Sequence, residues 1–125
     1  MTTTTYIEKA EALLEAAYGE LGEAQRTAEL TKARDAAGKA WAALVEASRA
    51  LFVARGVPPG ELPNTHRGTR FMLGRHADTE LQLTYYRSYQ DVHQDAYYDG
   101  LINFETLTER FSEIRQFIER VKELA

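Results

Sequence analysis

The chain of 125 residues contains no cysteine. Without a thiol, the protein has no disulfide, no thiolate metal site and no cysteine nucleophile. The chain also has no apolar run near the roughly 20 residues that a membrane-spanning helix needs. Its start, MTTTTYIEKAE, has neither the basic patch nor the apolar core of a secretory signal. We therefore expect a cytoplasmic protein that does not enter a membrane.

Positive charge is scarce. Fifteen Lys and Arg residues are outnumbered by nineteen Asp and Glu residues, and the net charge is −4. Proteins that hold long nucleic acids electrostatically usually show the opposite balance, so any RNA contact must be local. One segment, residues 62–77, has no acidic residue and gathers the positive side chains His66, Arg67, Arg70, Arg75 and His76. This segment predicts either a phosphate- or RNA-binding patch or a solvated loop and short helix.

Motifs for bound metals and nucleotides are missing as well. No two of the three histidines, His66, His76 and His93, have the i, i+4 spacing that places two metal ligands on one helical face. Neither GxxxxGK[ST] nor GxGxxG occurs, so there is no nucleotide loop of either kind. We expect no metal site and no cofactor.

The residues that are abundant favour helix. Ala, Glu, Leu and Arg lose little on entering a helix, and apolar residues recur at three- and four-residue spacing between the turn signals. The pattern predicts five helices: about Tyr6 to Gln25, about Thr31 to Arg55, residues 64–76, about Thr79 to Asp99, and from Phe104 to about Val121. Residues 1–125 should form a single all-α domain, an antiparallel up-and-down bundle of four long helices plus one short helix.

Polar residues and one glycine mark the predicted helix ends. The predicted N-terminal caps are Thr5 with Glu8 as a capping box, Asn64 or Thr65, Asp78, and Asn103. Gly100 should stop the fourth helix in a left-handed conformation.

The fourth helix contains the stretch RSYQDVHQDAYYDG, residues 87–100. Its aromatic stripe indicates a core helix in which His93 is packed and hydrogen-bonded, but Arg87 and His93 could also act on RNA. Six positions apart, they lie roughly 120° apart around a straight α-helix. They would converge only across a two-fold axis between two copies or at a kink, and the sequence predicts no kink.

Three stretches of the chain resemble the HEPN superfamily of small prokaryotic helical domains. Residues 37–56 (AGKAWAALVEASRALFVARG) are similar to the second helix of that family, residues 92–100 (VHQDAYYDG) to the end of its fourth helix, and residues 107–121 (LTERFSEIRQFIERV) to its closing helix. The likeness covers most of the chain in pattern and order. It implies an HEPN-like bundle that forms a homodimer about a two-fold axis.

The resemblance also implies a chemistry. Active HEPN proteins are metal-independent ribonucleases with an Arg-x(4–6)-His motif, which Arg87 and His93 match with five residues between them. His93 would then transfer a proton as general acid or base, and Arg87 would hold the phosphate. Tyr89 or Tyr97 would stack a base or donate a hydrogen bond. The residue after the arginine is commonly Asn, Asp or His in active members and is Ser88 here.

Two functions therefore remain open. The first is a dimeric interaction module, for which the resemblance implies a nucleotidyltransferase partner in a toxin–antitoxin-like pair. The second is a metal-independent endoribonuclease that uses Arg87 and His93. The negative net charge, Ser88 and the mid-helix position of the motif favour the first.

Overall fold

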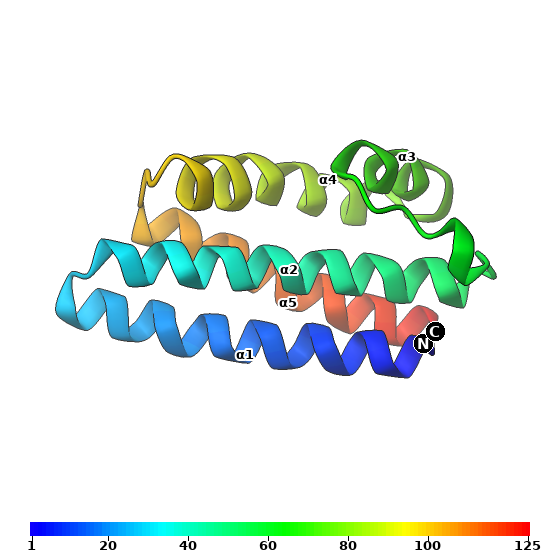
Figure 1. The fold of residues 1–125 in the computed structure, drawn as a ribbon, viewed down its shortest axis with the longest axis horizontal. Helices are drawn as coiled ribbons and strands as arrows, with labels where there is room; N and C mark the ends of the chain where they lie inside the picture. The colour runs from blue at the N-terminus through cyan, green and yellow to red at the C-terminus, as the bar shows by residue number, and fades with distance from the viewer.

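A computed structural model describes all 125 residues and contains helices and no strand (Figure 1). The elements are α1 (Thr3–Thr27), α2 (Leu30–Ala54), the short 3₁₀ turn η1 (Pro59–Glu61), α3 (His66–His76), α4 (Thr79–Ser88), the π-helix η2 (Tyr89–Tyr98) and α5 (Phe104–Leu124). The predicted all-α bundle is confirmed.

The long helices lie side by side. α1 runs from the end of the molecule where both termini lie to the opposite end, and α2 returns beside it (Figure 1). α4 and η2 form one continuous rod on the other side of α2, with α3 beside the start of that rod. α5 packs against α1, α2, α4 and η2, so it closes the bundle.

Helix α2 is the centre of the core. Its alanines at 33, 36, 37, 40, 43, 47 and 50 are fully buried, and small side chains let neighbouring helices approach closely. Leu44, Leu51 and Phe52 in α2 and Phe111 and Ile114 in α5 are also fully buried. Burying one such large side chain contributes about 1.5–3 kcal/mol, so the contact between α2 and α5 contributes several kcal/mol to the stability of the bundle.

Most predicted helix ends are confirmed. Asp78 accepts a hydrogen bond from the backbone N–H of Leu81 at 2.9 Å, and Asn103 accepts one from Thr106 at 3.0 Å. Of the two alternatives for α3, Thr65 is the cap, because its hydroxyl accepts from the N–H of Gly68. Gly100 has φ +68°, as a left-handed stop requires.

The predicted cap of the first helix is wrong. Thr2 caps α1, and its hydroxyl accepts from the N–H of Thr5 at 3.1 Å. The helix begins at Thr3 because Thr2 offers the same capping oxygen as Thr5 three residues earlier.

The helix predicted from Thr79 to Asp99 changes its hydrogen bonding after Ser88. From Tyr89 to Tyr98 it is a π-helix, in which N–H groups bond five residues back and each turn is wider than in an α-helix. Arg34 of α2 holds the end of this segment, because its guanidinium donates to the carbonyls of Tyr97 (2.9 and 3.0 Å) and Tyr98 (2.9 Å). π-Helices usually last a single turn and often occur at functional sites. The side chains of η2 are therefore candidates for a functional site.

Candidate functional site: an aromatic cluster around Trp41

Arg87 and His93 do not converge within one chain. The Nε of Arg87 donates to Oε1 of Glu113 on α5 at 3.2 Å. The imidazole of His93 instead stacks on the indole of Trp41 on α2, with ring centroids 4.7 Å apart. The two side chains thus extend from the rod towards different helices, α5 and α2. Within one chain they cannot both bind the same phosphate oxygen.

His93 belongs to an aromatic cluster, defined as Trp41, His66, Tyr85, Tyr89, His93, Tyr97 and Tyr98. Trp41 lies at its centre, with ring centroids 5.2 Å from Tyr85, 5.7 Å from Tyr89 and 4.7 Å from His93. The ring of His66 lies parallel to that of Tyr89 at 3.5 Å. Side chains from α2, α3, α4 and η2 therefore meet in one set of stacked and edge-on rings.

The π-helix explains how one rod supplies four members of this cluster at four-residue spacing: Tyr85, Tyr89, His93 and Tyr97. In an α-helix, residues four apart are rotated by about 40° relative to one another, so such a column drifts around the helix. The wider turn of a π-helix rotates each residue less and offsets this drift. The column therefore stays on the side of the rod that faces Trp41.

His66 is turned into the cluster. Its Nδ1 lies 2.9 Å from the hydroxyl of Tyr85. Burial lowers the pKa of His66, and the nearby Arg70 and His93 lower it further. Burial also raises the pKa of Tyr85, so a protonated phenol can donate to a neutral imidazole. With Nδ1 bonded to Tyr85, Nε2 is the ring nitrogen of His66 that remains for the predicted RNA or phosphate contact.

His93 is packed, but its Nδ1 is buried without a hydrogen-bond partner. Burial lowers the pKa of this imidazole, which is therefore neutral at pH 7. The hydroxyl of Ser88, at the junction of α4 and η2, is also buried without a partner. Ser48 in α2, by contrast, donates to the carbonyl of Leu44 at 2.9 Å. Two buried polar atoms without hydrogen-bond partners thus lie in the region where the rod changes from α- to π-helical geometry.

The other predicted binding residues lie in different surroundings. Arg67 and Arg75 are exposed on α3, and Arg70 lies over the ring of Tyr86 at 5.2 Å. Tyr89 is enclosed between His66 and Trp41, whereas Tyr97 is 43% exposed. The structure therefore places the arginines of α3 on an outer surface and the tyrosines in or beside the aromatic cluster.

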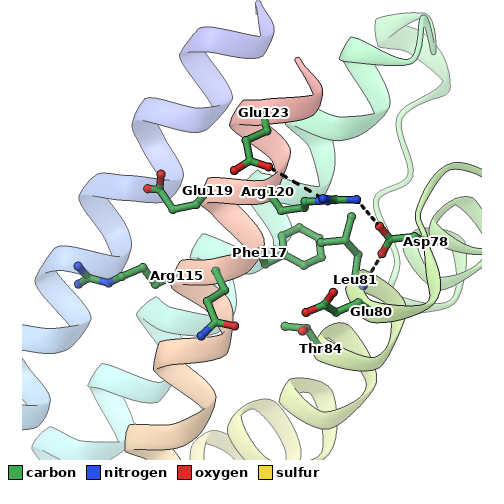
Figure 2. Close-up of a pocket in the computed structure, with 10 residues that line it drawn as sticks. Asp78, Glu80, Leu81, Thr84, Arg115, Phe117, Glu119, Arg120 and Glu123 are labelled. Atoms are coloured by element: carbon green, nitrogen blue, oxygen red, sulfur yellow. Dashed lines mark hydrogen bonds and ion pairs between the residues drawn. The ribbon is translucent and has the colours of Figure 1, made fainter.

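A separate hollow of about 390 Å³ lies between the start of α4 and α5 (Figure 2). Arg120 reaches across from α5 and donates to Oδ2 of Asp78 at 3.0 Å, with Glu123 on its other side (Figure 2). The other carboxylate oxygen of Asp78 accepts from Leu81 at the start of α4. These contacts compensate the charges of Asp78 and Arg120 and tie α4 to α5.

Four residues near the cluster were not predicted as functional: Arg34, Asp35, Gly38 and Trp41. Gly38 gave the one available signal, because a glycine inside an alanine-rich helix costs about 1 kcal/mol relative to Ala and indicates a close approach of another group. The contacts of the other three depend on helices that are distant in sequence, and spacing along α2 does not reveal them.

Comparison with protein-family models, curated proteins and solved structures finds no match to this chain. None of its helices is both long enough and apolar enough to cross a lipid bilayer. No three side chains of His, Asp or Glu come together in a group that could hold a metal ion.

Proposed function

We propose that this protein is a dimeric interaction module with an antiparallel, HEPN-like bundle. Two copies pair through the outer faces of α3, α4 and η2, and the pair binds a second protein. The resemblance of three stretches to HEPN domains makes a small nucleotidyltransferase the candidate partner, in a toxin–antitoxin-like pair. The packing of the His93 imidazole against Trp41 of α2 supports this function over catalysis.

The observation that carries the proposal is a difference in charge between α3, which lies beside one end of the rod of α4 and η2, and residues 88–109 at the other end. Residues 62–77, which include α3, carry three arginines and no acidic residue. Residues 88–109 carry five acidic residues and no Lys or Arg. Arg110 pairs with Asp91 and lies near Glu109, so the unpaired carboxylates are Asp95, Asp99 and Glu105. α3 lies beside the start of the rod, and residues 91–99 form its far end (Figure 1).

The basic end offers charges that the chain itself does not neutralise. None of the arginines of α3 forms an ion pair, although many other basic side chains of the molecule do. Phe71, Leu83 and Tyr86 on α3 and α4 are 66%, 45% and 43% exposed. Exposed apolar side chains next to unpaired charge are typical of a protein-binding surface.

A two-fold axis near the middle of the rod lets the partner copy neutralise the charge of both ends. Two rods that cross in opposite directions place the basic end of each copy over the acidic end of the other, and the symmetry forms the contact twice. Opposite charges at matched ends fix the register of such a pair.

Charge reversal tests this arrangement. Arg67→Glu with Arg70→Glu gives the basic end a negative charge, and Asp99→Arg with Glu105→Arg reverses two of the three unpaired negative charges of the acidic end. None of these four side chains forms an ion pair within the chain. We expect a wild-type dimer in sedimentation equilibrium, a monomer for each double variant alone, and a heterodimer when the two are mixed in equal amounts. A monomeric wild type, or double variants that dimerise as the wild type does, contradicts the proposal.

Co-purification tests for the second protein. We expect a small nucleotidyltransferase encoded beside this gene to co-purify with the wild type. Failure to co-purify leaves a homodimer and rejects the assignment of that partner.

A second candidate function is a metal-independent endoribonuclease. The Arg-x5-His spacing of Arg87 and His93 supports it, because a neutral imidazole can accept a proton while the arginine binds the phosphate. The ion pair of Arg87 with Glu113 is partly exposed, and pairs near the surface contribute only about 0–1 kcal/mol. Cleavage of mixed RNA in EDTA by the wild type, abolished in folded His93→Ala, would establish this activity; no cleavage by either would reject it.

A further inference from the structure

A second hollow, of about 380 Å³, opens beside the aromatic cluster between α1, α2 and η2. The lining residues that matter here are Asp35, Gly38, Lys39 and Trp41 in α2 and His93 and Tyr97 in η2. Sites for small molecules typically measure about 300–1,000 Å³, so the hollow can admit a compact ligand.

Gly38 gives the hollow its shape. A Cβ atom at this position would lie 2.7 Å from Cε1 and 2.8 Å from Cδ1 of Tyr97, closer than real Cβ contacts come. The ring of Tyr97 therefore lies directly against the backbone of α2, and it forms one wall of the hollow while remaining partly exposed to solvent.

The charge that remains in the lining is negative. The ammonium of Lys39 forms an ion pair with Glu20 on α1 and is neutralised there. The guanidinium of Arg34, next to Asp35 in sequence, is directed to the carbonyls of Tyr97 and Tyr98. Asp35 has no ion pair or hydrogen bond and is exposed, so its carboxylate is available to a ligand.

The remaining polar wall is neutral and aromatic. Burial keeps His93 uncharged at pH 7, so the imidazole adds no positive charge that would repel a cation. Trp41 and Tyr97 add the rings whose faces attract a cation placed within about 6 Å of their centroids. A carboxylate beside such rings is complementary to a positively charged, weakly hydrated group.

We propose that this hollow binds a small alkylammonium compound, with its charged nitrogen held between the carboxylate of Asp35 and the rings of Tyr97 and Trp41. The ligand proposal does not depend on the interaction module, because the hollow lies on the side of η2 that faces α1 and α2 and is formed within one chain. A dimer that fails to form therefore leaves the ligand proposal standing.

The test uses the full chain and its single tryptophan. The protein is titrated with tetramethylammonium chloride, with choline chloride and, separately, with adenosine, while sodium chloride holds the ionic strength constant. Trp41 emission reports occupancy directly, since this residue lines the hollow. The variants are Asp35→Asn and Tyr97→Leu, and Glu61→Gln is the control because it removes an exposed negative charge on η1, outside the hollow. Circular dichroism verifies that each variant is folded.

We expect saturable changes of emission with both cations, and a loss of affinity of about three- to tenfold in Asp35→Asn and in Tyr97→Leu. Glu61→Gln should bind as the wild type does. The proposal is overturned by an emission that does not saturate with either cation, by an affinity that Asp35→Asn leaves unchanged, or by an equal loss in Glu61→Gln. Binding of adenosine without binding of the cations also overturns it, since the hollow would then select a flat heterocycle.

Discussion

The imidazole of His93 lies almost parallel to the indole of Trp41, with ring centroids 4.7 Å apart and planes inclined by 18°. This contact joins η2 to the middle of α2, the most buried helix of the bundle. The protonation state of His93 is therefore linked to the packing of the core.

Stability should fall as the pH falls from 7.5 to 5. Burial holds the pKa of His66 and His93 below the ordinary value of 6.5, so the folded chain binds fewer protons than the unfolded chain in this range. The stabilisation from a lowered histidine pKa is complete above the unfolded value of 6.5 and is lost as the pH falls through the folded pKa. Thermal unfolding followed by circular dichroism should show a lower midpoint at pH 5 and a flatter pH dependence in His93→Phe. An equally steep dependence in that variant would refute the link.

A double-mutant cycle should show how strongly the Tyr97 ring restricts the residue at position 38. Alanine favours a helix by about 1 kcal/mol relative to glycine, but its Cβ displaces the Tyr97 ring. We expect Gly38→Ala to stabilise the Tyr97→Ala variant by about 1 kcal/mol and to give little or no gain in the wild type. Urea unfolding of the four proteins measures both values, and equal gains in the two backgrounds would show that the contact is not restrictive.

Arg34→Met should loosen the end of η2. The substitution removes the guanidinium that bonds to the last carbonyls of the π-helix but retains an apolar stem. We expect faster amide hydrogen exchange in residues 96–102 and a loss of about 1 kcal/mol of stability, because these are charge-assisted bonds at an exposed site. Arg55→Met is the control, since Arg55 is exposed just after α2 and forms no ion pair. Unchanged exchange in Arg34→Met would show that the π-helix persists without this clamp.

Two substitutions of Asp78 should separate its two roles. Asp78→Asn keeps an oxygen that can cap α4 but weakens the ion pair with Arg120, and an exposed pair of this kind contributes about 0–1 kcal/mol. Asp78→Ala removes the cap as well and should cost a further 0.5–2 kcal/mol, roughly, in the free energy of unfolding. Equal effects of the two variants in urea unfolding would show that the cap contributes nothing.

The helices could be predicted from sequence because their signals are local. Apolar spacing placed all five, and the caps Asp78 and Asn103 act on backbone N–H groups three residues away. The cap of α1 was misplaced because the run of threonines offers the same capping oxygen at several positions. Local signals thus determine where a helix exists better than they determine its first residue.

The π-helix could not be predicted because its causes are distant in sequence. Arg34 holds its end and Trp41 packs against its middle, and both belong to another helix. The same holds for the candidate site. The stripe on the fourth helix predicted that His93 could be packed, but only the folded chain shows that Trp41 is what it packs against and that its Nδ1 remains without a partner.

Each hydrogen bond of a π-helix reaches five residues back, one more than in an α-helix. The gene can therefore vary in length within η2 more easily than elsewhere. Loss of a single codon between 89 and 98 would allow part of the segment to return to i→i+4 bonding, and the rod would keep its continuity. In helices such as α2, the same deletion would rotate every following side chain out of the core. Related chains that differ in length by one residue should therefore carry the difference in this segment.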